Sequence, residues 1–267
     1  MSDVTGAILA GGLGTRLRSV VSDRPKVLAP VRGKPFLAHL LDQLLESGVG
    51  RVVLLTGYRG EQIQEAFGDQ YRELALAYSI EPAPLGTAGA LRFALSQLFP
   101  ASAPGTNGAL DGVLVLNGDS YCDADFTKFR AFHDQERGDA SLVLAQVPDT
   151  SRFGKVDVGP NHRLQRFLEK QQAGGSGWIN AGIYLLNREL IEQIPAGRAV
   201  SIEREMFPEW LRNRRLLGFR SEGAFLDIGT PESYQAAEEF LARLGRAAAP
   251  PNGFRCPEPA GDWSRGI

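Results

Sequence analysis

Three glycines and an arginine follow a short apolar run near the start of the chain, in the stretch AILAGGLGTRL of residues 7–17. Glycine has no β-carbon, so the backbone N–H groups of Gly11, Gly12 and Gly14 can approach phosphate oxygens, and Arg16 adds a fixed fork of donors. The spacing is not G-x-G-x-x-G, no Gly-Lys-Ser/Thr follows, and the second strand ends without an acidic residue, which disfavours dinucleotide binding and the P-loop. We therefore predict a phosphate loop of another type, with a ligand-free glycine turn as the alternative.

A lysine stands between two prolines a short way downstream, at Lys26 in the stretch RPKVLAPV. Pro25 and Pro30 predict that this segment is extended rather than helical. A lysine held there can point inward at the phosphate that the glycine loop binds. The alternative is a solvated lysine at the surface, where most lysines lie.

Two aspartates follow predicted strands. The stretch VLVLNGDSY predicts a buried strand that runs into Asp119, and FLDIGTP repeats this arrangement at Asp227. Ligands collect beyond the carboxyl ends of such strands. We expect the two carboxylates to share a hard cation that also binds phosphate, although each aspartate alone would suit a turn. The run DAD at 123–125 resembles the D-x-D of nucleotide-sugar-dependent glycosyltransferases, a weak signal because three-residue patterns arise easily by chance.

The elements that must position these residues alternate along the chain. In the first half, apolar runs of strand length alternate with helical periods, which predicts a parallel, doubly wound sheet. Apolar runs between 140 and 186 are separated by turn residues and predict antiparallel or mixed strands that extend this sheet. Thr230 and Pro231 predict the N-cap and first turn of a last helix. The predicted strands are 6–10, 51–56, 74–80, 113–116, 140–147, 155–158, 163–167 and 178–186, and the predicted helices are 36–46, 61–67, 87–98 and 231–244.

Composition limits the classes of function. The 267 residues carry 29 Lys and Arg against 31 Asp and Glu, a net charge of -2, so we expect no nucleic acid polymer as a partner. Cys122 and Cys256 lie far apart without metal-ligand spacing, which predicts two free thiols. The apolar run at 7–10 is too short for a signal peptide or a membrane span. We therefore expect a cytoplasmic protein with no membrane partner.

The three histidines do not indicate catalysis. His39 and His133 fall in helical segments and His162 in a turn, without the spacing of a triad or a metal site. No protein nucleophile is apparent. This suits phosphoryl transfer, because an ionised phosphate needs no general base, and positioning and charge neutralisation do most of the work.

Six blocks of the sequence together resemble the sugar-1-phosphate nucleotidylyltransferase family. They extend over roughly residues 5–240 in the order and spacing of that family. Within the family, the first block most resembles the D-glycero-D-manno-heptose 1-phosphate guanylyltransferases. The blocks are AILAGGLGTRLRSVVSDRPKVLAPVRGKPFL, EPAPLGTAGAL, NGDSY, FLEK, NAGIYLLN and FLDIGTPESY.

The resemblance implies an α/β fold of the Rossmann-like nucleotide-diphospho-sugar transferase type, with a central mixed, mostly parallel sheet flanked by helices. Together with the loss of periodicity after Arg246, it predicts one nucleotidyltransferase domain over 1–246 and a peripheral Pro- and Gly-rich tail at 247–267. The expected halves are a nucleotide-binding half at 1–138 and a sugar-binding half at 139–246. The amphipathic segment 33–48 suits either a sheet face or a partner copy, so a homo-oligomer stays open.

The resemblance also implies roles at the phosphates. Arg16 would brace the leaving pyrophosphate and Lys26 would contact the phosphate during transfer. Asp119 and Asp227 match the family's Mg2+-binding pair, and the residues so implied as catalytic are Arg16, Lys26 and Asp119. The implied nucleotide-binding residues are Ala10, Gly11, Gly12, Gly14, Thr15, Arg16, Glu81, Gly86 and Thr87.

For the sugar phosphate, the resemblance implies a second set of residues. Lys170 would grip the phosphate, and Gly154 would let the sugar approach the backbone. Glu169 and Asn180 would accept from or donate to sugar hydroxyls. Gln171 departs from the family, since many members have proline there, and leaves the shape of that loop open.

Glu81 allows a prediction of which nucleobase is bound. Thymidylyl and uridylyl relatives commonly place glutamine at this position. A carboxylate only accepts hydrogen bonds, and guanine offers two donors on its Watson–Crick edge, so GTP is favoured over pyrimidine nucleotides. The alternative is that Glu81 caps a strand end.

The expected reaction is nucleotidylyl transfer from GTP to a sugar 1-phosphate, D-glycero-α-D-manno-heptose 1-phosphate, which gives an NDP-sugar and pyrophosphate. Mannose 1-phosphate guanylyl transfer and uridylyl or thymidylyl transfer are alternatives in the same class. A glycosyltransferase that uses the D-x-D would release no pyrophosphate. A nucleotide-sugar-binding regulatory protein is disfavoured because Arg16, Lys26 and both aspartates are intact.

Overall fold

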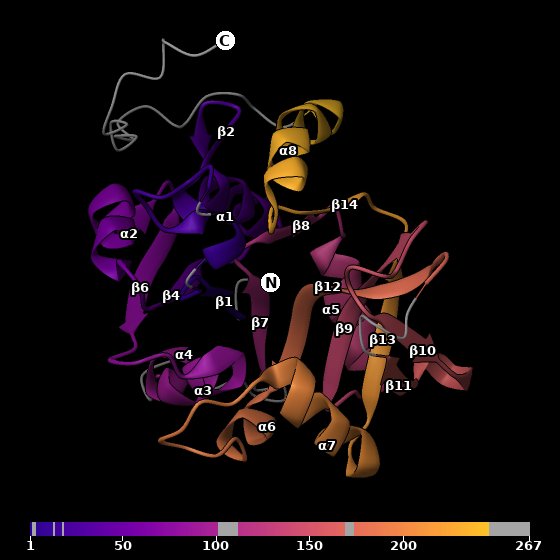
Figure 1. Cartoon of the computed structure of the whole chain (residues 1–267). Coiled ribbons are helices and arrows are strands. Elements are labelled where there is room, and N and C mark those ends of the chain that lie inside the picture. Colours follow the sequence, from indigo (N-terminus) through magenta and orange to yellow (C-terminus); the bar gives the residue numbers. More distant parts are fainter. Residues whose placement is uncertain (2–3, 13, 18, 101–111, 169–173, 246–267) are drawn as a thin grey trace.

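The computed structural model describes residues 1, 4–12, 14–17, 19–100, 112–168 and 174–245 (Figure 1). Most strands of this part of the chain belong to one sheet. They are β1 (Thr5–Leu9), β4 (Arg51–Thr56), β5 (Gln70–Tyr71), β6 (Leu74–Ile80), β7 (Gly112–Asn117), β9 (Ala140–Val147), β12 (Gly177–Asn187) and β13 (Leu216–Ser221). Three small pairs lie outside it, β2 (Pro30–Val31) with β3 (Lys34–Pro35), β8 (Ser120–Cys122) with β14 (Phe225–Asp227), and β10 (Lys155–Val158) with β11 (Leu164–Leu168).

Within the described residues, the main sheet has eight strands in the order β13-β9-β12-β7-β1-β4-β6-β5. β1 pairs in parallel with β4 and β7, and β4 pairs in parallel with β6. β12 runs antiparallel to both β7 and β9, whereas β9 and β13 are parallel. The mixed, mostly parallel sheet predicted from the sequence is confirmed, and the carboxyl ends of β1, β4 and β7 meet at one edge.

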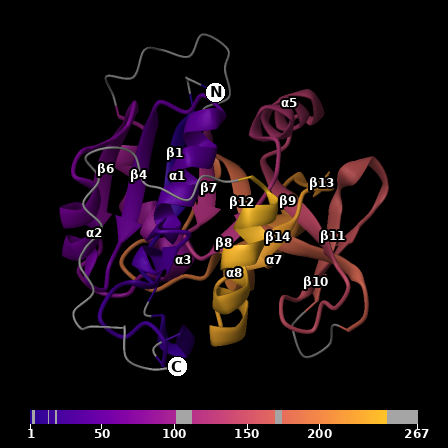
Figure 2. The same ribbon diagram turned by 90° about the horizontal axis from the view of Figure 1, so that it is seen from above.

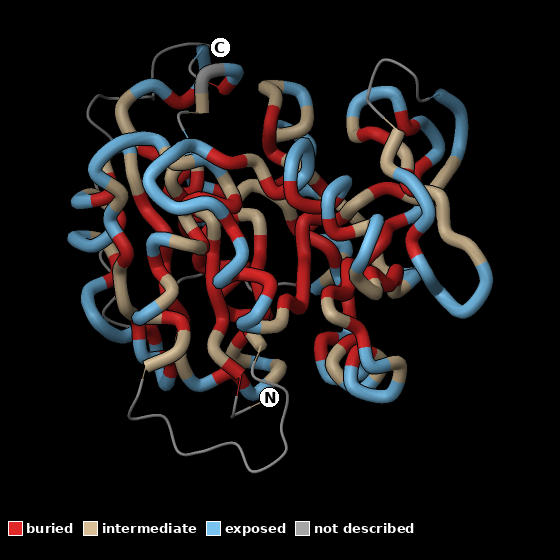
Figure 3. Tube along the Cα trace, turned by 90° about the horizontal axis from the view of Figure 1, so that it is seen from below, coloured by how far each residue is buried: buried red, intermediate tan, exposed pale blue. Residues whose placement is uncertain are grey.

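Helices cover both faces of the sheet (Figures 1 and 2). Because strand side chains alternate between faces, Ile8 and Leu54 pack into one core whereas Ala7 and Leu55 pack into the other. Figure 3 shows the buried positions concentrated along the strands, with the exposed ones on the outer loops. The first core is completed by α1 (Phe36–Glu46), α2 (Gly60–Phe67), α5 (Phe126–Glu136) and α8 (Pro231–Arg243), and the second by α3 (Gly86–Phe93), α4 (Leu95–Leu98), α6 (Arg188–Glu192) and α7 (Phe207–Asn213).

The helix expected over 87–98 is interrupted. It divides at Ala94 into α3 and α4, and Leu91 of the first and Leu98 of the second both pack into the same core. The N-cap expected at Thr230 is confirmed, because its hydroxyl accepts from the Ser233 backbone N–H at 3.3 Å. Among the described residues, none of the helices has the length and apolar character needed to cross a membrane.

The main sheet continues across the boundary expected at residue 138. β9, β12 and β13 come from the second half and join the strands of the first half through the β12–β7 pair. The division into two halves therefore stays a prediction. The expected tail at 247–267, which includes Cys256, lies outside the described residues, whereas Cys122 is a buried free thiol.

Candidate active site

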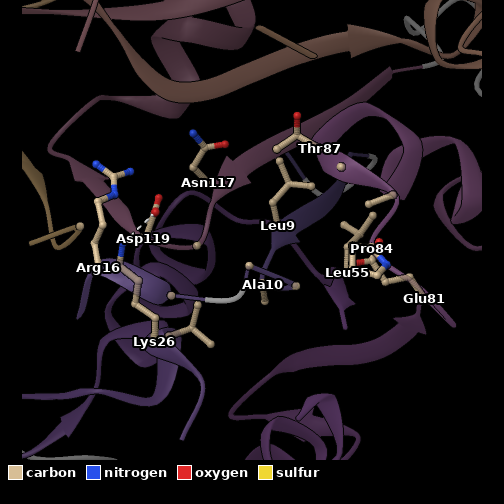
Figure 4. A pocket seen from close by; sticks show the side chains of 18 residues that line it. Leu9, Ala10, Arg16, Lys26, Leu55, Glu81, Pro84, Thr87, Asn117 and Asp119 are labelled. Carbon is tan, nitrogen blue, oxygen red and sulfur yellow. Dashed lines mark hydrogen bonds and ion pairs between the residues drawn. The ribbon is translucent and has the colours of Figure 1, made fainter. Parts of the chain in front are cut away.

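A cavity of about 370 Å3 lies at the carboxyl ends of β1, β4 and β7. Figure 4 shows Arg16, Lys26 and Asp119 at one end of it and Glu81 at the other. Thr15 lies in the short 3-10 helix Thr15–Leu17 beside this lining, and its side chain is outside the described part of the structure. The sequence-predicted residues that line the cavity are Ala10, Gly11, Gly12, Gly14, Arg16, Lys26, Glu81, Gly86, Thr87 and Asp119.

The segment that carries Lys26 is not extended as predicted. Residues Lys26–Leu28 form a single 3-10 turn, in which the Leu28 N–H donates to the Pro25 carbonyl at 2.9 Å. Proline is tolerated before a first helical turn because its missing N–H is not needed there. Pro30 restricts only the residue before it, so the two prolines bound the turn rather than prevent it.

The turn aims the Lys26 side chain at Asp119. Lys26 Nζ donates to Asp119 Oδ2 at 2.9 Å, which brings together the two charged groups expected at the phosphates. Burial acts to raise the pKa of the Asp119 carboxyl, but the Lys26 ammonium and its hydrogen bond outweigh this effect and hold the pKa below its usual value. Asp119 therefore stays ionised at neutral pH.

The second predicted acid, Asp227, lies next to Asp119 through strand pairing. β14 pairs antiparallel with β8 so that Asp227 is opposite Ser120, and the Ile228 N–H donates to the Asp119 carbonyl at 2.9 Å. Asp227 Oδ1 accepts from the Gly229 N–H at 3.0 Å and from the Arg152 guanidinium at 3.4 Å. Asp227 is not part of the cavity lining, although Gly229, two residues further along, is.

Asp119 and Asp227 are too few to bind a metal ion alone, so substrate phosphates would have to supply further ligands. In the part of the chain that the structure describes, no group of three or more His, Cys, Asp or Glu residues could hold a metal ion on its own. Mg2+ is commonly bound through one or two carboxylates plus substrate phosphates. Asp119 and Asp227, on neighbouring backbone segments, supply oxygen donors of that type.

The two aspartates of the DAD run, Asp123 and Asp125, lie in segments that form local hydrogen bonds within the fold. Asp125 Oδ1 accepts from the Lys128 N–H at 2.9 Å and caps α5, and this bond lowers the pKa of its carboxyl. The Asp123 N–H donates to the Ala224 carbonyl at 2.9 Å, which ties the run to the loop before β14. Neither aspartate lines the cavity.

Glu81 forms the opposite end of the cavity. Its Oε2 accepts from the Leu85 N–H at 3.1 Å, which fixes the orientation of the carboxylate. Burial raises the pKa of Glu81, and the hydrogen bond from Leu85 opposes this rise. Its other oxygen, Oε1, lies so close to Gly11 and Gly57 that β-carbons there would stand only 2.9 and 2.7 Å from it. Glycine at both positions makes room for the carboxylate.

The family model described as nucleotidyl transferase matches residues 5–243. The chain belongs to the nucleotidyl transferase family. It is 36% identical over 250 residues to the mannose-1-phosphate guanylyltransferase of Mycobacterium tuberculosis, a match that covers 92% of the chain and 67% of that relative. It is 35% identical over 234 residues to the D-glycero-alpha-D-manno-heptose 1-phosphate guanylyltransferase of Aneurinibacillus thermoaerophilus, covering 88% of the chain and 96% of that relative.

Solved structures agree with this assignment. Two crystal structures of HddC from Yersinia pseudotuberculosis, one of them complexed with GMP-PN, are 33% identical to the chain and have TM-scores of 0.76 and 0.75. Each match covers 89% of the chain and 99% of HddC. The resemblance expected from the six sequence blocks is confirmed, and so is the Rossmann-like fold.

This nucleotidyl transferase has a second, smaller cavity of about 160 Å3 between β10, β11 and β12. Gly154 and Asn180, both expected at the sugar phosphate, line it. Leu168, the last residue of β11, also contributes. Glu169, Lys170 and Gln171 follow directly and lie outside the described residues.

Sequence reasoning missed several lining residues. Asn117 lines the first cavity and stands in the same NGD block as Asp119, so its place at a strand end could have identified it. Glu203 lines the second cavity, but it does not follow a predicted strand and belongs to none of the six sequence blocks. It lies in a single π-helical turn, Ile202–Met206, which approaches β12 only in the folded chain.

Proposed function

We propose that this chain transfers a guanylyl group from GTP to a sugar 1-phosphate. The anionic phosphate oxygen of the sugar attacks the α-phosphorus of GTP and forms a new P–O bond. The bond between the α-phosphorus and the oxygen of the β-phosphate breaks, and pyrophosphate leaves with that electron pair. The products are the NDP-sugar and pyrophosphate.

The proposal depends on one observation: charged groups suited to phosphates lie at one end of the cavity, and a hydrogen-bond acceptor suited to a base lies at the other. Arg16, Lys26 and Asp119 lie at one end and Glu81 at the other (Figure 4). A nucleoside triphosphate has the matching layout, with charge at one end and a hydrogen-bonding base at the other. The larger cavity therefore suits the nucleotide, and the smaller one suits the sugar.

The chain's own residues would act by binding and charge neutralisation. The glycine loop presents backbone N–H groups to the triphosphate, and Arg16 and Lys26 offset the negative charge that develops as pyrophosphate leaves. The attacking phosphate is already ionised, so the step needs no general base. Lys26 also holds Asp119 in place through their 2.9 Å hydrogen bond.

Asp119 and Asp227 would hold Mg2+, which when bound supplies charge neutralisation and alignment to the phosphates. Asp227→Asn should raise the Mg2+ concentration needed for half-maximal rate with little change in the KM for GTP. Asp157→Asn, at an aspartate of β10 outside both cavities, serves as the control. An unchanged Mg2+ requirement in Asp227→Asn would remove Asp227 from the metal site.

The proposed sugar is D-glycero-α-D-manno-heptose 1-phosphate, and the second candidate is mannose 1-phosphate. Both are supported by relatives at similar identity, whose names specify these substrates. HddC, which was solved with GMP-PN, supports a guanosine nucleotide.

The proposed division of the chain into two halves is supported by the cavities. The first cavity draws almost all its lining from residues before 138, and the second draws its lining from residues after 139. A cytoplasmic location remains part of the proposal.

The deciding experiment is pyrophosphate release in the presence of Mg2+, crossing GTP, dTTP, UTP, CTP and ATP with a panel of sugar 1-phosphates that includes the heptose and mannose compounds. We expect release with GTP and one of these two sugars. Release with another nucleotide would overturn the base assignment and keep the reaction. No release with any pair, from protein shown to be folded, would overturn the proposed reaction and favour the regulatory or glycosyltransferase alternatives.

A further inference from the structure

Glu203 lines the second cavity, where the proposed function places the sugar. It lies in the π-helical turn Ile202–Met206 and shares the lining with Gly154 and Asn180. This carboxylate is exposed and belongs to none of the sequence blocks that indicated a site. The structure thus adds a carboxylate to the second cavity that the sequence did not indicate.

Two side chains of β12 hold the Glu203 carboxylate. Asn180 Nδ2 donates to Glu203 Oε1 at 2.9 Å and to the Tyr184 hydroxyl at 2.9 Å. The Tyr184 hydroxyl in turn donates to Glu203 Oε1 at 3.4 Å. Asn180 Oδ1 accepts from the Gly182 N–H at 3.0 Å, so the amide is oriented with its nitrogen toward Glu203. Asn180 is thus engaged within the protein and acts on the cavity through Glu203.

An irregularity in β12 brings these side chains together. In a regular strand, side chains four residues apart lie roughly 13 Å apart, too far for a hydrogen bond. The pairing of β12 with β9 shifts between Asn180 and Tyr184, and Gly182 has a left-handed φ of 75°. β-bulges of this kind redirect side chains near functional sites.

The same irregularity connects the two cavities. A β-carbon on Gly182 would lie 2.7 Å from Asn117 Nδ2, so glycine is needed for Asn117 to pack there. Asn117 lines the nucleotide cavity and also hydrogen-bonds the Tyr184 phenol. Tyr184 is completely buried and stacks edge-on against Phe207. Its hydroxyl therefore lies at the wall that separates the nucleotide from the sugar.

Burial keeps this hydroxyl neutral. Desolvation, reinforced by the Glu203 charge, raises the pKa of Tyr184 well above its ordinary value. The phenol thus remains a donor to Glu203 throughout the working pH range. A carboxylate held by two donors has a defined direction, and it can only accept hydrogen bonds.

We propose that Glu203 accepts hydrogen bonds from the ring hydroxyls of the sugar 1-phosphate and determines which sugar is used, and that Tyr184 is its positioning residue. The inference rests on the proposed function, because it assigns the sugar to the second cavity. The substrate class it specifies is a neutral pyranose with free hydroxyls on the face toward Glu203. A site built to bind a hydroxyl rejects analogues that lack it, because its own polar group is then left without a partner.

The test compares Glu203→Gln with wild type on the accepted sugar 1-phosphate and on its singly deoxygenated analogues. For wild type, removal of the hydroxyl that faces Glu203 should lower kcat/KM about 10-fold to 100-fold. For Glu203→Gln, the same removal should cost less than about threefold, because the charged acceptor is gone. The KM for GTP should stay unchanged in both. Equal losses for both proteins with every analogue would overturn the proposal.

Tyr184→Phe tests the positioning role. It removes only the hydroxyl, so the KM for the sugar 1-phosphate should rise about threefold to tenfold, with a smaller change in the KM for GTP. An equal change in both KM values would indicate a role in the fold alone, and no change in either would indicate no role for the hydroxyl; both results would overturn the positioning role. Glu209→Gln, at an exposed glutamate of α7 outside both cavities, is the matched control.

The result separates this inference from the proposed function. If wild type releases no pyrophosphate with any sugar 1-phosphate, the proposed function has failed before Glu203 is tested. If wild type is active and Glu203→Gln keeps the full discrimination among analogues, only the inference about Glu203 has failed. Circular dichroism and the unfolding temperature of each variant identify a general loss of structure.

Discussion

Lys26 Nζ and Asp119 Oδ2 lie 2.9 Å apart, although the two residues are 93 positions apart in the sequence. The Lys26 side chain is 12% exposed and that of Asp119 is 43% exposed, so solvent partly screens the pair. Pairs of this kind contribute little to stability. This pair instead places an ammonium and a carboxylate together at the end of the cavity that we propose binds the phosphates.

Lys26→Ala should therefore affect turnover far more than folding. Removing a charge that stabilises the transferring phosphate should lower kcat by about 10²-fold or more, by comparison with other electrostatic stabilisers. The measurement is steady-state pyrophosphate release, together with a thermal unfolding curve. Lys128→Ala, at a lysine whose side chain is 77% exposed, is the control and should match wild type. A Lys26→Ala protein with wild-type kcat would exclude Lys26 from the mechanism.

Gly86 gives a prediction about the loop before α3. Its φ is 70°, and a β-carbon there would lie 2.6 Å from the Val200 carbonyl oxygen, which accepts from the Ala88 N–H at 3.0 Å. Gly48 has a similar φ of 78° but open space around it. Gly48→Ala should thus cost only backbone strain, about 1 to 2 kcal/mol, whereas Gly86→Ala adds a clash with backbone that cannot move freely.

Urea unfolding of the two glycine variants measures the difference. We expect Gly86→Ala to be less stable than Gly48→Ala by at least about 1 kcal/mol. Because Gly86 also lines the nucleotide cavity, its variant should show a raised KM for GTP. Equal stabilities would mean that the Val200 loop moves aside without cost.

The nucleotide side of the site was largely predictable because its signals are local. The glycine loop and Asp119 each follow a buried strand directly, and parallel strands bring their carboxyl ends to one edge. Since β1 and β7 are neighbouring parallel strands, the glycine loop after β1 and Asp119 after β7 lie close together for any conformation of the loops. Lys26 lines the same cavity as the glycine loop, but its 3-10 turn was not predicted, because the two prolines restrict their neighbours less than expected.

The sugar side was less predictable because its contacts are set by the tertiary fold. Asn180 reaches Tyr184, which shares the contact with Glu203, only because β12 is irregular at Gly182. No periodicity or spacing in the sequence reports such contacts, and the resemblance to a family indicated Asn180 without its partner.

His39 gives the chain a specific pH dependence of stability. It is 2% exposed, and its Nε2 lies 3.0 Å from the Val31 carbonyl oxygen, to which it donates. Burial lowers the pKa of His39 from 6.5 to about 4, so the folded chain holds it neutral. Between these values the unfolded chain binds more protons than the folded chain. Stability therefore falls as the pH is lowered through this range, by up to about 1.4 kcal/mol per pH unit.

The measurement is the free energy of unfolding in urea at about pH 7, 6 and 5 for wild type and His39→Gln. Wild type should lose about 1 kcal/mol more than the variant between the two lower pH values. His133, whose pKa burial also lowers, is present in both proteins and cancels in the comparison. Parallel pH profiles would show that His39 is not buried as a neutral group.

Glu81→Gln tests how the base is read. Because Oε2 is held by the Leu85 N–H, a glutamine that keeps this bond through its oxygen must turn its NH2 group toward the base. Two donors would then face the donors of guanine, and kcat/KM for GTP should fall about 10-fold to 100-fold, whereas the low rate with dTTP should change less than about threefold. Competition between GTP and dTTP measures this ratio, with Glu73→Gln, at an exposed position outside the cavity, as the control. An unchanged preference for GTP would mean that groups other than the Glu81 side chain select the base.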